Sequence, residues 1–287
     1  MQEIHIEDIE ESIHLHTKKK SSNLFDGTFR SLFHGRSLEF DDLREYHYGD
    51  DVHDIDWKAS SRSDKTLIRK NIAEKKHYLV FVLDHHKELA GHTPKNIEKS
   101  TVLTQALGIL AYLLKEENID YALLYGTSKG IELTRFSSTE EHLENCLHIC
   151  NTYSEEETKY TLNDLLIHCL ENIPRRLFLV TLSDVYSLKE VDKKIIGELE
   201  EKNDVFSIVV RDALLTSPQA YDLQEKCYAE EEFLYDASLE KIEQEEKEKL
   251  EIDIKTTFLQ EGARCIFIED EESYYTKLEE LFQGQDE

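Results

Sequence analysis

The stretch Tyr78-Leu-Val-Phe-Val-Leu-Asp84 decides the fold of this chain. Six hydrophobic residues run without interruption into a carboxylate. Such a run is typical of a strand that is buried on both faces, in the centre of a parallel sheet covered by helices. Ligands of open parallel sheets collect beyond the carboxyl ends of the strands, so Asp84 is a candidate functional residue.

A second stretch repeats this pattern further along the chain. Leu177-Phe-Leu-Val-Thr-Leu182 leads into Ser183-Asp184. Further strands are predicted at 66–72 (an edge strand leading into the central one), 121–125, 130–134, 205–210 and 264–268. Helical spacing of apolar residues predicts helices at 1–20, 97–117, 139–150, 161–171, 189–202, from 238 onward and at 275–282. Strands that alternate with such helices predict an α/β protein with a doubly wound sheet.

The two carboxylates Asp84 and Asp184 have two interpretations. They can converge at the carboxyl edge of the sheet and form a site. Alternatively, each can cap the helix that follows its strand, a common use of aspartate.

The chain is strongly acidic. It has 287 residues, with 34 Lys+Arg against 61 Asp+Glu, and a formal charge of -27. Phosphate backbones and anionic membranes attract proteins through Lys and Arg, so nucleic acid is not expected as a partner. Basic protein surfaces are the expected partners.

Other bulk features predict a soluble protein of the cytoplasm. No segment approaches the ~20 apolar residues that a membrane-spanning helix needs, so no membrane insertion is expected. Residues 1–11 are polar and unlike a secretory signal. The five cysteines are an odd number without a disulfide-like framework, as in proteins of a reducing compartment.

An acidic cluster precedes the central strand. Four aspartates within seven positions repel one another unless cations compensate them, and either fixed arginines or a bound metal can do so. We expect ion pairs that brace this segment against the sheet, with Trp57 as a buried anchor. The charged residues concerned are Asp50, Asp51, Asp54, Asp56, Arg44, Lys58 and Arg62.

Three groups of residues resemble a known metal site. Asp84-x-His86-x-Glu88 follows a strand, Thr161 begins a helix, and Asp184 follows a later strand. This order is similar to the metal site of von Willebrand factor A-type domains, whose first motif is Asp-x-Ser-x-Ser, followed by a distal Thr and a distal Asp.

A more specific resemblance covers residues from about 33 to 282. Their pattern is similar to the hallmark of the bacterial family called domain of unknown function fifty-eight, which joins that hallmark to an A-type domain. Later matches are Arg175-Arg176, Val210-Arg211-Asp212 and Leu234-Tyr235-Asp236. The hallmark positions are Arg44, Tyr46, Gly49, Asp50, Asp51, Asp56, Trp57 and Arg62.

The resemblance implies a von Willebrand factor A-like (Rossmann-like), mostly parallel sheet in residues 77–287. Residues 1–76 are then a family-specific segment that packs on this sheet.

The metal motif departs from the family pattern. His86 and Glu88 stand where the family has two serines, and Lys159-Tyr160 replaces the usual glycines before Thr161. Imidazole is a poor substitute for a hydroxyl at a magnesium ion. We therefore expect a degenerate site in which the usual magnesium is lost or altered, and no cofactor. The alternative is a mixed site for zinc or manganese built from Asp84, His85, His86, Glu88 and Asp184.

A second zinc candidate lies on a predicted helix. His142, Cys146 and Cys150 are spaced at i, i+4 and i+8, on one helix face. Together with Leu143 and Leu147 they also form an ordinary apolar stripe, in which cysteine behaves as a small hydrophobe. Core packing is the favoured interpretation.

The resemblance implies a non-enzymatic, protein-binding adaptor or scaffold. It also implies pairing with a MoxR-type AAA+ ATPase, which is the first partner to test. The alternative is a metal-dependent hydrolase that uses Asp84, His85, His86 and Asp184. A purely structural homo-oligomer is a third possibility.

Overall fold

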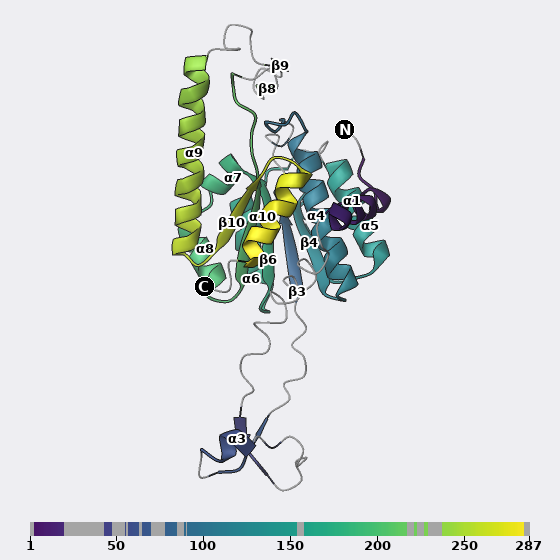
Figure 1. Cartoon of the computed structure of the whole chain (residues 1–287), viewed down its shortest axis with the longest axis vertical. Coiled ribbons are helices and arrows are strands. Elements are labelled where there is room, and N and C mark those ends of the chain that lie inside the picture. The colour runs from purple at the N-terminus through teal and green to yellow at the C-terminus, as the bar shows by residue number, and fades with distance from the viewer. Residues whose placement is uncertain are drawn as a thin grey trace. The chain divides into compact units, whose positions relative to one another are not determined.

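The computed structural model describes residues 3–19, 43–47, 55, 57–62, 65–69, 78–84, 89, 91–153, 158–216, 221–222, 227–228 and 237–283. The chain divides into two compact units. The larger unit combines Met1–Ser21 with His77–Glu287, and the smaller unit is Ser22–Lys76. Figure 1 shows both units and labels many of their elements.

A six-stranded sheet forms the centre of the larger unit. The strands are β3 (Tyr78–Leu83), β4 (Asp120–Gly126), β5 (Ile131–Leu133), β6 (Phe178–Asp184), β7 (Asp204–Val210) and β10 (Arg264–Ile268). Their order is β10-β7-β6-β3-β4-β5, and only β5 runs antiparallel to its neighbour. The von Willebrand A-like, doubly wound sheet expected from the sequence is confirmed.

The strand order reverses between β3 and β6. From β3 the chain first builds outward through β4 to β5, and then returns to add β6, β7 and β10 on the other side. Register pairs Leu83 with Leu182, so the two strands end side by side. This is the topological switch point, where doubly wound proteins bind their ligands.

Helices cover both faces of the sheet, which explains why the central strand is apolar throughout. Leu79 to Leu83 are all buried. The helices on one face pack around α4, and those on the other face share one apolar cluster with the sheet. The first group is α1 (Ile6–Lys19), α4 (Lys99–Glu116), α5 (Glu140–Tyr153) and α10 (Glu271–Gln283). The second group is α6 (Leu162–Asn172), α7 (Val185–Lys189), α8 (Lys193–Glu200) and α9 (Ala237–Gln260).

The N-terminal helix α1 belongs to the sheet unit. Ile9 is 1% exposed and packs against α4 at Gly108, where an added Cβ would lie 2.7 Å from the Ile9 Cδ1 atom. The Asn151 side chain holds the backbone of Ile4 at both ends, accepting from its N–H at 3.1 Å and donating to its carbonyl at 2.8 Å. Ser12 donates to Glu271 of α10 at 2.5 Å. These contacts tie the helix to α4, α5 and α10.

Capping explains two of the differences between the predicted and the observed helix boundaries. The stretch predicted as one helix, 189–202, is divided between α7 and α8, because the Asp192 side chain accepts from Lys194 N–H at 3.0 Å and starts α8. The last helix starts at Glu271 and not at 275, because Asp270 accepts from Ser273 N–H at 2.8 Å.

The smaller unit contains a two-stranded antiparallel ladder and one helical turn. Strand β1 (Leu43–Glu45) pairs with β2 (Leu67–Arg69), and α3 (Trp57–Ser60) lies between them in sequence. Tyr46 N–H extends the ladder by donating to Thr66 O at 2.8 Å. The strand predicted at 66–72 is present at Leu67–Arg69, but its described partner is β1 of the hallmark segment and not a strand of the main sheet.

Trp57 is 70% exposed at the start of α3, so its prediction as a buried anchor is wrong. Arg62 is exposed as well. Gly49, Asp50, Asp51, Asp54 and Asp56 lie outside the described residues, as do Leu234, Tyr235 and Asp236. The expected packing of the hallmark segment on the sheet stays a prediction.

A short antiparallel ladder precedes the long helix α9. It pairs β8 (Tyr221–Asp222) with β9 (Cys227–Tyr228).

Candidate functional site

Asp84 and Asp184 both lie at the carboxyl rim of the sheet, as predicted. Each is 0% exposed. Asp84 N–H donates to Leu182 O at 3.0 Å, which fixes the end of β3 against β6. The two strands that carry these carboxylates are the neighbours between which the sheet reverses its order.

Both carboxylate oxygens of Asp184 accept hydrogen bonds from the protein. Its Oδ1 accepts from the Ser187 N–H at 2.9 Å and caps α7, so the capping interpretation holds for this residue. Its Oδ2 accepts from the Lys99 Nζ atom at 3.0 Å. Each oxygen of the Asp184 carboxylate therefore already has a hydrogen-bond donor from the protein.

Lys99 bridges two aspartates inside the protein. It is 1% exposed, and its ammonium donates both to Asp184 and to Asp212, which follows β7. Burial alone would lower the pKa of Lys99, but the charges of Asp212 and Asp184 outweigh burial and raise this pKa. The lysine is therefore charged at neutral pH. It sits at the first position of α4, where the helix macrodipole disfavours positive charge, so the carboxylates are its necessary compensation.

Asp212 shares this one ammonium with Asp184. Burial raises the pKa of Asp212, Lys99 lowers it, and the nearby charge of Asp184 raises it again, with a net upward shift. Asp212 is therefore easier to protonate than an ordinary aspartate.

Backbone hydrogen bonds bring Lys99 and Asp212 together. Lys99 N–H donates to Gly91 O at 3.0 Å, and Ala213 N–H donates to His92 O at 2.8 Å. The loop before α4 is thereby joined to the segment after β7, and the two charged side chains are placed on either side of this junction.

Sequence reasoning missed Lys99. A signal was nevertheless present, because Lys99 lies four residues before Leu103 and seven before Ala106, on the stripe that α4 buries. A lysine on a buried stripe needs a carboxylate partner. The identity of that partner could not be read from the sequence, because Asp184 and Asp212 are distant along the chain.

Thr161 begins α6, as predicted, and its described contacts are local. It forms a capping box with Asp164, in which Thr161 N–H donates to Asp164 Oδ2 at 2.8 Å and Asp164 N–H donates to Thr161 Oγ1 at 3.2 Å. The preceding loop passes over Gly126, where an added Cβ would lie 2.7 Å from Thr158 Oγ1. His85, His86 and Glu88 lie outside the described residues.

The described side chains around Asp184 do not fit a resident divalent ion. The carboxylate that such an ion would need is already paired with Lys99. A divalent ion about 4 Å from an ammonium is repelled by roughly 8 kcal/mol at an effective dielectric constant of about 20. Among the residues that the structure describes, there is also no group of three or more His, Cys, Asp or Glu side chains arranged to hold a metal.

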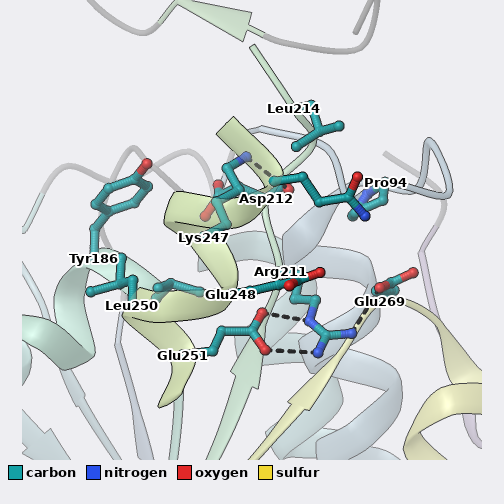
Figure 2. A pocket seen from close by; sticks show the side chains of 12 residues that line it. Pro94, Tyr186, Arg211, Asp212, Leu214, Lys247, Glu248, Leu250, Glu251 and Glu269 are labelled. Atoms are coloured by element: carbon teal, nitrogen blue, oxygen red, sulfur yellow. Dashed lines mark hydrogen bonds and ion pairs between the residues drawn. The ribbon is translucent and has the colours of Figure 1, made fainter. Parts of the chain in front are cut away.

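A cleft of about 250 Å³ opens beside this cluster (Figure 2). Arg211 binds Glu251 of α9 through two hydrogen bonds, 2.6 and 2.8 Å long, and Glu269 through one of 2.8 Å. These bonds join α9 to the ends of β7 and β10. The cleft is lined by Pro94, Val185, Tyr186, Arg211, Asp212, Leu214, Gln244, Lys247, Glu248, Leu250, Glu251 and Glu269.

The cleft is acidic and has an aromatic side chain at its edge. Its four carboxylates outnumber its two cations, Arg211 and Lys247. Tyr186 is 49% exposed, and its pKa is raised by burial and then by the charges of Asp212 and Glu243, so the phenol stays neutral. Such a surface suits a basic partner with an apolar contact.

The second zinc candidate is a core cluster. His142, Cys146 and Cys150 are all buried, and His142 Nε2–H donates to Tyr121 O at 3.0 Å. Burial raises the pKa of the Cys146 thiol to about 12, and it also raises the pKa of Cys150. Both thiols are therefore protonated at neutral pH, as the core-packing interpretation expects.

His142 gives a testable pH dependence. Burial is the main cause that lowers the pKa of His142 below its usual value. Below about pH 6.5 the unfolded chain therefore binds a proton at His142 more readily than the folded protein does, and the free energy of unfolding falls. His142→Leu removes this loss, and Tyr121 O keeps its bond from Ser137 N–H at 3.1 Å.

We expect the variant to be less stable than wild type at about pH 7.5 and the difference to shrink towards about pH 5.5. Urea unfolding at several pH values measures this. If the stabilities of the two proteins change with pH in the same way, the prediction is wrong.

The chain matches the family described as "Protein of unknown function DUF58" over residues 42–217, which is more than half of its length. No curated protein matches it. Within the described ranges, no helix combines the length and the apolarity that a membrane span requires.

Several solved structures are similar to the chain at low identity. The conserved hypothetical protein BatB from Bacteroides thetaiotaomicron has 8% identity and a TM-score of 0.45, over 72% of this chain and 98% of that one. An aerotolerance-related membrane protein from Bacteroides fragilis has 8% identity and a TM-score of 0.43, over 73% of this chain and 100% of that one. The pilus adhesin SpaC from Lactobacillus rhamnosus GG has 7% identity and a TM-score of 0.46, over 75% of this chain and 31% of that one. Similarity at this level carries no argument about function.

Proposed function

The chain belongs to the family "Protein of unknown function DUF58", and from that premise we propose that it is a non-enzymatic, protein-binding adaptor or scaffold of the cytoplasm. The observation that carries this proposal is the acidic cleft at the carboxyl rim of the sheet. The cleft lies next to the topological switch point, where this fold class binds its ligands.

The chemistry of the cleft indicates the kind of partner. Carboxylates in excess favour a basic surface, in keeping with the formal charge of -27 on the whole chain. Tyr186 supplies a half-exposed aromatic ring with a polar end, the type of side chain that anchors interfaces. The first partner to test is a MoxR-type AAA+ ATPase.

The alternative function is a metal-dependent hydrolase that uses Asp84, His85, His86 and Asp184. The adaptor is favoured because Asp184 already accepts from Lys99 and Ser187. Two further thiols, Cys169 and Cys265, have pKa values that burial raises to about 12, so they are not activated nucleophiles.

A charge reversal in the cleft tests the proposal. Glu248 is exposed on α9 and lines the cleft, so Glu248→Lys is expected to weaken binding of a purified MoxR-type ATPase by about tenfold or more. Asp253 is exposed on the same helix outside the cleft lining, so Asp253→Lys is a control that makes the same change in charge. Calorimetric titration with the ATPase measures the affinities.

We expect the control to retain the wild-type affinity within about twofold and the binding to weaken with added salt. Wild-type protein that does not bind the ATPase, or equal losses in both variants, contradicts the proposal.

A further inference from the structure

We infer that the ammonium of Lys99 is the resident cation of the sheet's switch point, and that this rim is therefore stable without a divalent ion. The inference concerns the cation that compensates Asp184 and Asp212, and it does not depend on which partner the cleft binds. Two carboxylates share one lysine, which supplies the positive charge that compensates them.

The geometry supports this assignment because one nitrogen atom serves two carboxylates. Lys99 Nζ donates to Asp184 Oδ2 and to Asp212 Oδ1. Two oxygens that lie within hydrogen-bond reach of the same atom also have a spacing that two ligands of one metal ion can adopt. The lysine thus occupies the position from which a cation would contact both.

Burial of the ion pair disfavours replacement of Lys99 by a divalent ion. The Lys99 and Asp184 side chains are 1% and 0% exposed. Breaking their ion pair would leave a buried charged atom without a partner, which is costly. The second oxygen of Asp184 is held by Ser187 N–H. An incoming divalent ion would have to displace a lysine whose Nζ atom donates to two carboxylates.

The location of Lys99 in the sequence supports a dedicated role. It begins α4, and the residue before it, Glu98, makes no side-chain capping bond to the helix. A cation in the first helical turn is unfavourable by itself. Its position is explained by the two carboxylates that it bridges, one after β6 and one after β7.

The inference predicts how the protein responds to Mn²⁺. Wild-type protein is expected to unfold at the same temperature in millimolar Mn²⁺ and in EDTA, after metal has been removed. Lys99→Ala removes the ammonium and leaves the buried oxygens of Asp184 and Asp212 without a cation, so Mn²⁺ is expected to raise its unfolding temperature in a saturable way.

Two further variants complete the test. Lys99→Arg keeps the charge and is expected to remain indifferent to Mn²⁺. Lys247→Ala removes a lysine from the neighbouring cleft, where Lys247 donates to Ala213 O at 2.7 Å and pairs with Glu243, and it is also expected to remain indifferent. Thermal unfolding followed by circular dichroism, with Mn²⁺ added alone, gives the readout.

A saturable rise in the unfolding temperature of wild-type protein overturns the inference, as does a folded Lys99→Ala variant that ignores Mn²⁺. Should Lys99→Ala be unfolded in EDTA, its recovery by Mn²⁺ is the expected result. If Mn²⁺ does not recover it, the wild-type and Lys99→Arg proteins provide the test. Unfolding temperatures that Mn²⁺ leaves unchanged in both proteins support the inference, and a rise in either one overturns it.

Discussion

Lys99→Met is expected to lower the free energy of unfolding by about 3–5 kcal/mol, the cost of removing one partner from a buried ion pair. The loss arises because Asp184, which is 0% exposed, and Asp212 are left without their cation, and a buried carboxylate must then either carry an unpaired charge or take up a proton at a cost. Methionine has nearly the length of lysine, so little of the loss is due to an empty cavity. Urea unfolding measures the change through the shift of the midpoint at constant slope.

An exposed lysine provides the matched control. Lys249 pairs with Glu246 at 2.7 Å on the surface of α9, where both side chains are more than two-thirds exposed. Lys249→Met is expected to leave the midpoint of unfolding unchanged, because exposed ion pairs contribute little. If Lys99→Met were as stable as this control, the buried bridge would not exist as described.

Ile9→Ala is expected to destabilise the protein by about 2–5 kcal/mol, as for other fully buried isoleucines. Ile9 is 1% exposed, and Gly108 allows it to approach the backbone of α4 so closely that no side chain fits between them. Truncation leaves a cavity that the rigid helices cannot close. Thermal or urea unfolding measures the loss.

Glu11→Ala is the control for this second prediction. Glu11 is exposed on the same helix, so its replacement is expected to change stability by less than about 0.5 kcal/mol. Equal stability of the two variants would show that α1 does not pack on α4.

The sheet could be predicted because its strands carry their own signal. The central strands β3 and β6 are mainly apolar, and each leads into an aspartate that marks the carboxyl rim. Parallel pairing then forces the ends of β3 and β6 to the same edge. The positions of Asp84 and Asp184 on one rim follow from this local pattern and from the topology of the fold class.

The charge pairing at the rim could not be predicted in the same way. Lys99, Asp184 and Asp212 come from three separate connections between helices and strands, and no periodic pattern links them. The motif centred on Asp84 predicted metal ligands, whereas the cation that the structure shows beside Asp184 is the Lys99 side chain. Trp57 shows the opposite error, since a large apolar side chain was expected to be buried and is exposed.

The position of α1 has a consequence for how the chain folds during synthesis on the ribosome. This helix is synthesised before the surfaces that it packs against, which belong to α4, α5 and α10. The chain must also complete Ser22–Lys76 before the sheet unit resumes at His77. Part of its apolar stripe therefore stays uncovered on the nascent chain until α10 has been synthesised, and contacts so distant in sequence form slowly.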